Sequence, residues 1–420
     1  MVDVSATGSP MLTTADGRPL KDALLAAQAR AKRRAFLLVL PLLLFILITF
    51  IWPIVQVLKQ SAYNPKFSAN MPGMVQWFDA NPVGTEPDEA AFAILVADLR
   101  AAAAAKTVAV AGERVNYELS GSRSLFTSTG RKAKSLEPPF KEALIALDPK
   151  WGDPVLWGVM RQVSSAITSD FYLSALDLRH DVDGSIVRVE ENQRVYVNLF
   201  LRTFALSAAI TLICLILGFP IAHLLAVLPI RRSNLLMILV LLPFWTSLLV
   251  RTTSWMVMLQ GQGVVNSVLV WAGILTEDGR LAMINNMMGT VIAMTHILLP
   301  FMILPLYSVM RPIPPSYVRA ARSLGATSWT AFRRIYLPQT LPGIGAGGLL
   351  VFILSVGYYI TPALVGGASG QLISNLIAFH VNKSNNWSLA AALATILLAA
   401  ILVLYWLYDK LVGIDKMKLG

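Results

Sequence analysis

Long apolar runs separated by polar segments occupy much of the chain. Six runs reach the roughly 20 residues that cross the hydrocarbon core of a bilayer, and each is predicted to be helical because lipid offers backbone groups no hydrogen-bond partner. The predicted spans are Ala35–Leu58, Leu199–Leu228, Leu235–Leu259, Met287–Met310, Leu341–Val365 and Leu389–Tyr408. A seventh run, Val264–Leu275, has only about 12 residues, a length typical of an interfacial or re-entrant segment. The pattern predicts an all-α polytopic membrane protein with six transmembrane helices.

Between the first two spans, residues 59–198 have the mixed composition of a soluble domain. Apolar spacing and alanine content predict a helix over residues 87–106. A second helix is predicted over residues 153–167, which begin with Asp and Pro, residues that favour the N-cap and the first turn. Residues 176–191 alternate apolar and polar positions around an Asp-Gly dipeptide, a preferred hairpin turn. We predict a small mixed α/β insert that folds outside the membrane.

Basic residues next to the spans gather in four of the polar segments. These are the tail 1–34, the connection with Arg231 and Arg232, the connection 311–340, and the C-terminal segment 413–420 together with Lys410. Cytoplasmic segments carry an excess of Lys and Arg, so all four segments and both termini are predicted to be cytoplasmic. The insert is then extracytoplasmic, and residues 199–412 form a five-helix core. The first span follows a polar tail without a cleavage site, which predicts a retained helix rather than a signal peptide.

The net charge of +11 follows the same distribution. Residues 61–196 hold 14 Lys and Arg against 17 Asp and Glu, a net charge of −3, and the rest of the chain holds 21 against 7, a net charge of +14. The excess is therefore the basic bias of cytoplasmic segments, and we expect no nucleic-acid partner. The only cysteine, Cys214, lies within a span, so no intrachain disulfide is possible.

Two motifs in the insert each lack a required residue. Asp181, Asp183, Gly184 and Glu190 match the spacing of a calcium-binding loop, but Arg179 occupies the first ligand position, where a cation repels the metal. Residues 119–123 faintly resemble a nucleotide-clamping signature, yet the chain contains no Gly-Lys dipeptide and so no phosphate-binding loop of that type. We expect no metal, no cofactor and no catalytic residue on this chain.

The connection after the fourth span is basic and amphipathic. It is predicted to form a short helix that places Arg319 and Arg322 on one face and Ala320, Ala321 and Leu324 on compact apolar surface. Gly325 permits the chain to reverse, and a second short helix follows with its apolar side formed by Trp329, Phe332 and Ile335. Such a unit suits insertion into a groove of another protein. It also suits the lipid surface, where basic residues contact anionic headgroups.

These two interpretations are separated by a resemblance to a known family, which the spacing A-A-x3-G-x9-I-x-L-P carries. This spacing is formed by Ala320, Ala321, Gly325, Ile335, Leu337 and Pro338, and it resembles the signature cytoplasmic loop of permease subunits of binding-protein-dependent ABC importers. Residues 215–226, 241–259, 297–310 and 356–367 are similar to spans of the spermidine/putrescine-type branch, so the resemblance covers about residues 199–410. That family usually has Glu where Arg319 stands, and we predict an acidic partner residue opposite Arg319.

The resemblance implies a six-helix permease of the bacterial inner membrane. Its coupling loop, with Arg319 and the six motif residues, is expected to dock into a cytoplasmic ABC ATPase dimer. A second permease subunit, in a heterodimer, and an extracytoplasmic solute-binding protein are the other implied partners, with membrane lipid around the spans. The solute is expected to be small, polar and organic, with spermidine- or putrescine-like polyamines first and opine- or amino-acid-like compounds as the alternative.

Five residues within or near the spans are candidates for the translocation pathway. Arg251 lies inside the third predicted span, where an ionised side chain costs about 2.5–3.5 kcal/mol on insertion scales. It either faces an interior cavity or extends toward the headgroups. His296 either lines the pathway or is a packing histidine. Trp255, Tyr358 and Tyr359 either contact solute or anchor the protein at the membrane surface.

Two other classes of membrane protein remain as alternatives. An ion-coupled carrier usually needs a carboxylate within a span, and between Val197 and Tyr408 the only acids are Glu277 and Asp278, in a predicted outside connection. A membrane sensor would use the insert to detect a ligand, but it would have no use for four further spans and a coupling-like loop. The sequence therefore favours a transport subunit driven by ATP hydrolysis on a separate chain.

Overall fold

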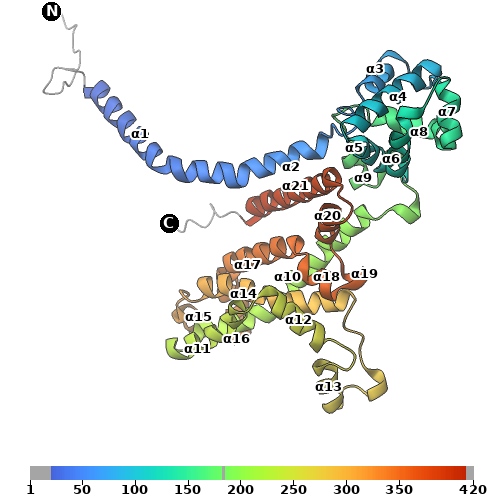
Figure 1. Ribbon diagram of the computed structural model, residues 1–420. Coiled ribbons are helices and arrows are strands. Elements are labelled where there is room, and N and C mark those ends of the chain that lie inside the picture. Colours follow the sequence, from blue (N-terminus) through green and yellow to red (C-terminus); the bar gives the residue numbers. More distant parts are fainter. Residues whose placement is uncertain (1–19, 182–184, 413–420) are drawn as a thin grey trace, which may run out of the picture. The chain divides into compact units, whose positions relative to one another are not determined.

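The computed structural model describes residues 20–181 and 185–412, and it divides at Lys59 into two units (Figure 1). The first unit contains α1 (Leu20–Ile46), a π-helical turn (Leu47–Ile51) and most of α2 (Trp52–Ala62). Pro53 lies two residues after the π turn, and its missing N–H cannot bond the carbonyl of Thr49, which accounts for the irregular turn. The helical stretch Ala27–Ala62 is apolar enough to span a membrane and is longer than the predicted Ala35–Leu58.

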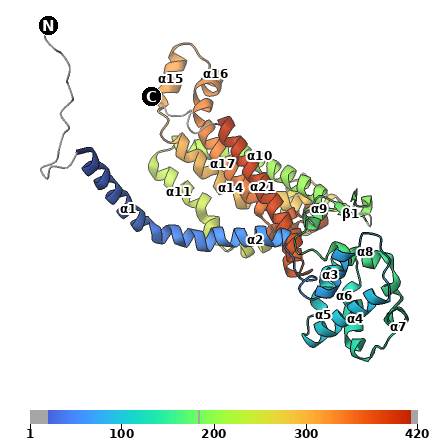
Figure 2. The same ribbon diagram turned by 90° about the horizontal axis from the view of Figure 1, so that it is seen from above.

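The insert is a helical lobe with one small hairpin. Figure 2 shows α3 to α8 packed around one another, over a core that includes Phe92, Leu95, Leu99, Phe126 and Trp151. The helices are α3 (Pro72–Ala80), α4 (Glu89–Ala104), α5 (Val108–Asn116), α6 (Ser122–Lys132), α7 (Phe140–Leu147), α8 (Pro154–Gln162) and α9 (Asp170–Ala175). Both predicted helices are present as α4 and α8. The carboxylate of Asp153 accepts a hydrogen bond from the N–H of Val155, as expected of an N-cap.

The β part of the insert is smaller than a mixed α/β domain requires. Strands β1 (Leu178–His180) and β2 (Ile186–Arg188) pair antiparallel, with Arg179 opposite Val187. The predicted turn at Asp183 and Gly184 lies outside the described residues. Most of the described insert is helical because its apolar positions recur at helical spacing over residues 89–162. The sheet of the predicted mixed α/β insert is present only as a two-stranded hairpin.

Four more helices in the described residues are long and apolar enough to span a membrane, and a bent pair forms a further candidate. The long helices are Tyr196–Val227, Met287–Met310, Ser328–Gly357 and Trp387–Lys410. They correspond to α10 (Tyr196–Val227), α14 (Met287–Met310), α17 (Leu337–Gly357) with the segment before it, and most of α21 (Trp387–Val412). The bent pair is α11 (Ile230–Leu241) with α12 (Leu248–Met258). Residues Val264–Trp271 form the short α13, which has only 8 residues and is too short to cross a bilayer.

Helices α10, α14 and α17 pack closely at the centre of this bundle. A Cβ at Gly347 of α17 would lie 2.9 Å from Sδ of Met302 in α14, and one at Gly218 of α10 would lie 3.1 Å from Cγ of the same residue. The two glycines therefore let the helices approach closely here, and a larger residue would displace the side chain of Met302. Their common core includes Ile210, Leu298, Met302 and Val351.

The third predicted span is not one continuous helix. The chain bends by 96° between α11 and α12. Pro243 lacks the N–H that would continue α11, and Ser247 begins a new helix by accepting a hydrogen bond from the N–H of Val250 at 3.2 Å. The prediction of a continuous helix over Leu235–Leu259 is therefore wrong.

The fifth predicted span is also divided. Helix α17 ends at Gly357, and α18 (Ile360–Val365) begins after a break at Tyr358 and Tyr359. Pro362 cannot donate to the carbonyl of Tyr358, and that carbonyl accepts a hydrogen bond from the hydroxyl of Ser374 instead. Short α19 (Gly367–Gly370) and α20 (Ile373–Asn382) then lead to α21. The span predicted as Leu341–Val365 thus starts earlier and ends earlier than expected.

Candidate functional site

The segment between α14 and α17 contains the two helices that the sequence predicted. The first is α15 (Pro315–Ser323) and the second begins as α16 (Ser328–Ala331). Gly325 has a φ of +91°, in the left-handed region that glycine adopts readily. Its N–H donates to the carbonyl of Arg322, and the N–H of Ala326 donates to the carbonyl of Ala321, both at 3.0 Å. These two bonds form a Schellman motif, which ends α15 and reverses the chain.

The second helix continues without interruption into the membrane span. A π-helical turn (Phe332–Tyr336) connects α16 to α17, and it is followed by Pro338, whose missing N–H cannot bond the carbonyl of Arg334. Phe332 stacks between Trp329 and Tyr336, with ring centroids 5.7 and 5.9 Å apart. The hydroxyl of Tyr336 lies 2.9 Å from Nδ1 of His223 on α10. The aromatic side chains therefore join this segment to the helical bundle.

The exposed side of the segment combines apolar and basic residues. Leu324 is 89% exposed, Trp329 68% and Tyr317 51%. Arg319 and Ala320 are exposed beside them, whereas Ala321, Ile335 and Leu337 are half-buried. Among the described residues, Arg319 has no hydrogen-bond or ion-pair partner. Large apolar side chains beside free cations give the segment a surface that suits an acidic protein groove.

A second cluster joins the two broken helices. Trp255 of α12 donates from Nε1 to Nδ1 of His296 on α14, at 3.1 Å. The hydroxyls of Thr252 on α12 and Thr361 on α18 lie 3.2 Å apart and are buried. Neither threonine was a candidate from the sequence, because only the fold brings residues 109 positions apart into contact.

The guanidinium of Arg251 belongs to the same cluster. It lies within the range of electrostatic interaction with His296 and with Tyr358, at the break after α17. Its Nε and one terminal nitrogen are buried without a hydrogen-bond partner in the described chain. The structure thus brings together Arg251, Trp255, His296 and Tyr358. Tyr359 is 46% exposed, and its carbonyl accepts from the side chain of Asn375 instead.

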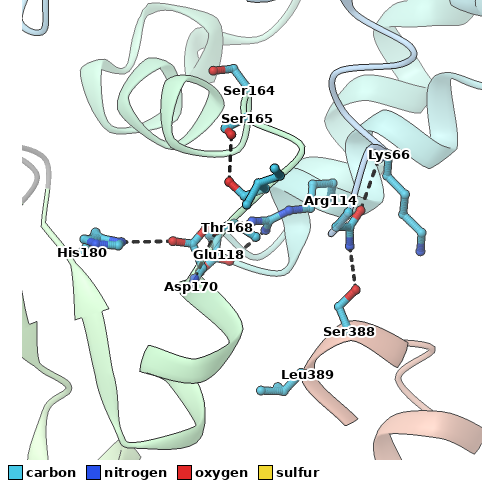
Figure 3. Close-up of polar contacts among 12 residues, drawn as sticks. Lys66, Arg114, Glu118, Ser164, Ser165, Thr168, Asp170, His180, Ser388 and Leu389 are labelled. Carbon is cyan, nitrogen blue, oxygen red and sulfur yellow. Dashed lines mark hydrogen bonds and ion pairs between the residues drawn. The ribbon is translucent and has the colours of Figure 1, made fainter. Parts of the chain in front are cut away.

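A third polar group lies where the insert meets the helical bundle (Figure 3). Buried Arg114 donates to Asp170 and to Glu118, both at 2.8 Å, and Nδ1 of His180 lies 3.0 Å from the other oxygen of Asp170. Burial is the largest influence on both carboxyl groups. It raises the pKa of Glu118, whereas hydrogen bonds from Thr168 and Gln162, with the charge of Arg114, lower the pKa of Asp170. Asp170 is therefore the ionised partner of Arg114.

Hydrogen bonds and apolar packing hold the insert to α10 and α21. The carboxylate of Asp177 accepts from the N–H groups of Val195, Tyr196 and Val197 at the start of α10, at 2.9–3.1 Å. The side chain of Asn64 donates to the hydroxyl of Ser388 at 3.0 Å. Around these bonds an apolar cluster contains Phe171, Ala175, Leu199, Phe200, Leu389 and Leu393. The insert therefore contacts α10 and α21 through hydrogen-bonded polar groups and buried apolar side chains.

The chain is similar to known membrane transport proteins. The family described as binding-protein-dependent transport system inner membrane component matches residues 214–412. PotB of Haemophilus influenzae, a spermidine/putrescine transport system permease protein, is 36% identical over 222 residues, which are 52% of this chain and 77% of that protein. PotB of Escherichia coli is 35% identical and is covered to 80%. The inner membrane ABC transporter permease protein YdcU of Escherichia coli is 31% identical over 226 residues, 51% of this chain and 72% of YdcU.

Proposed function

The chain belongs to the family of binding-protein-dependent transport system inner membrane components, and from this premise we propose that it carries a small polar organic solute inward through an ATP-driven importer. It is a multi-pass permease subunit of the inner membrane and not an enzyme. The observation that carries the proposal is the exposed two-helix segment from α15 to the π turn, with its motif spacing and its Schellman turn at Gly325. Such a segment supplies a rigid projection through which force from a neighbouring protein enters the bundle.

The segment docks into a cytoplasmic ABC ATPase dimer. Leu324 and Tyr317 supply the apolar contacts, and an acidic residue of the ATPase pairs with Arg319. Closure of the ATPase dimer on ATP moves the segment, and the continuous helix from Ser328 to Gly357 carries that movement to the break beside Arg251. Both termini are cytoplasmic, a second permease subunit completes the pathway, and a solute-binding protein delivers the solute from outside.

The polyamine class is the first choice for the solute. Support comes from the similarity to two PotB proteins, whose names specify spermidine and putrescine. Compounds that resemble amino acids or opines are the second choice, because the span residues contain a free arginine and no carboxylate to pair with a cation. The same lack of carboxylates disfavours an ion-coupled carrier.

The test is purification of the chain with its associated proteins, followed by reconstitution into liposomes. An ATPase is expected to co-purify, and its activity is expected to rise when a solute-loaded binding protein is added. Uptake should stop when ATP is depleted and should persist when the proton gradient is collapsed. Uptake that follows the proton gradient in the absence of ATP would establish a carrier and overturn the proposal.

A further inference from the structure

We propose that the cluster around Arg251 receives a carboxylate of the transported solute, so that the solute is an organic amine that also carries a carboxylate. The inference rests on the proposed function, because it requires a solute to pass this cluster. It narrows the solute class to zwitterionic amines. It therefore reverses the order that sequence similarity gives, and places the amino-acid-like compounds before the plain polyamines.

The first step of the argument is the unbalanced charge of Arg251. A guanidinium stays protonated in proteins, and a buried charge without a partner is strongly unfavourable. Two other arginines of the bundle have acceptors: Arg311 donates to the carbonyls of Ala226 and Leu228, and Arg202 donates to that of Ala368. Arg251 donates to no group in the described chain, and two of its nitrogens are buried. The residue is nevertheless not fully enclosed, so a ligand can reach it.

The second step is the backbone around it. Irregular backbone at membrane depth is tolerated where it is buried in protein or lines a cavity, and transporter sites are often built from interrupted helices. Two interruptions meet here, one before α12 and one between α17 and α18, and the hydroxyls of Thr252 and Thr361 hold them together. Arg251 lies one turn from the first interruption and within electrostatic range of Tyr358 at the second.

The third step is the chemistry of the missing partner. A carboxylate accepts two parallel hydrogen bonds from a guanidinium, and such a charged, two-bond pair is stronger than a neutral hydrogen bond. This chain offers none, since Glu277 and Asp278 are the only acids between Val197 and Tyr408 and Glu277 is paired with Arg280 at 2.8 Å. Trp255 and Tyr358 belong to the same cluster, and aromatic rings can attract the ammonium group of such a solute.

The test compares amines with and without one carboxylate. Ornithine and putrescine differ only in the α-carboxylate, as do lysine and cadaverine. Equilibrium binding of each is measured on the complete complex, with its second permease and ATPase, in lipid nanodiscs and without binding protein. We expect ornithine and lysine to bind at least about tenfold more tightly than putrescine and cadaverine. The variant Arg251→Gln should lose this preference, and Arg251→Lys should keep part of it because it retains the charge without the fork.

Arg280→Gln is the matched control, since it removes a guanidinium that already has a partner, and its preference should equal that of the wild type. Four outcomes would overturn the inference. In the wild type, three of these are equal binding of both members of a pair, tighter binding of putrescine and cadaverine, and binding of none of the four compounds. The fourth is a preference for ornithine and lysine that survives in Arg251→Gln. Equal binding of both members of a pair by the wild type, combined with poor assembly of Arg251→Gln with the second permease, would show that Arg251 pairs with a carboxylate of the second permease instead of the solute. ATP-driven uptake by the wild type is measured in parallel. If that uptake is present, the proposed function holds even when the inference about Arg251 fails.

Discussion

Gly325 shows how much depends on one backbone conformation. Its φ of +91° is needed for the Schellman turn between α15 and α16, and an added Cβ would meet nothing within 4 Å. The cost of Gly325→Ala is therefore conformational and amounts to about 1–2 kcal/mol. We expect the ratio of stimulated to basal ATPase activity to fall several-fold. Gly348→Ala is the control, because that glycine lies inside α17 with its nearest potential contact at 3.9 Å. An unchanged ratio in Gly325→Ala would show that the turn does not transmit force.

Substitution of Arg319 tests whether the ATPase supplies an acidic residue to pair with it. The side chain is exposed and has no partner in the described chain, so its charge is free to pair with a carboxylate on the ATPase. Arg319→Glu should weaken co-purification of the ATPase and lower ATP-driven uptake about tenfold, because it places like charges together. Arg334→Glu, which reverses another exposed charge in the π turn, is the comparison. If Arg319→Glu leaves co-purification and uptake unchanged, Arg319 forms no ion pair with the ATPase.

At the scale of elements, the sequence predicts features that depend on neighbouring residues, such as helix ends and turns, but not those that depend on contacts between distant elements. Helix α14 begins and ends at the predicted Met287 and Met310, and the turn at Gly325 follows from a glycine after an amphipathic helix. The break at Tyr358 depends on Ser374. Its hydroxyl donates to the carbonyl of Tyr358, to which Pro362 cannot donate, and a contact between residues so far apart in the sequence cannot be predicted from a local pattern. The sequence singles out Arg251, Trp255 and His296 only as separate candidates, and that two nitrogens of Arg251 are buried without a hydrogen-bond partner in the described chain follows only from the packing of the helices.

The ionic group that joins α5, α9 and β1 makes a prediction about pH. Asp170 has its pKa held below the ordinary 3.8, against the effect of burial, by hydrogen bonds and by Arg114. Its stabilisation is therefore fully present above that ordinary value and is lost as the pH falls through the lower pKa of the folded state. Asp170→Asn should destabilise the insert by about 3 kcal/mol at neutral pH, and the difference should shrink below about pH 4.

Hydrogen exchange of the insert in the full-length protein, at pH 3 to 8, measures this difference. Exposed Glu142→Gln serves as the reference and should leave protection unchanged at every pH. A difference between Asp170→Asn and wild type that stays constant down to pH 3 would show that the carboxylate contributes no ionised partner to Arg114.

At the scale of the whole molecule, the central question is whether the insert and the bundle from α10 to α21 respond as one body. Asp177 belongs to the insert, yet its carboxylate satisfies three N–H groups at the start of α10, where a helix has no backbone partners of its own. The apolar cluster around Phe171 adds buried contact between α9, α10 and α21. A force applied to the insert by a docked protein would then reach α10 directly.

Asp177→Ala tests this coupling, because it leaves the three N–H groups without an acceptor and should cost about 1–2 kcal/mol. If the junction acts as one body, hydrogen exchange should accelerate both in α9 and in the first turns of α10, and uptake at saturating binding protein should fall. Asp148→Ala removes a smaller cap that lies wholly within the insert, where the carboxylate accepts from the N–H of Lys150, and it should accelerate exchange only locally. Acceleration on one side of the junction alone in Asp177→Ala would show that the insert moves independently, so that binding-protein contact with it could not drive α10.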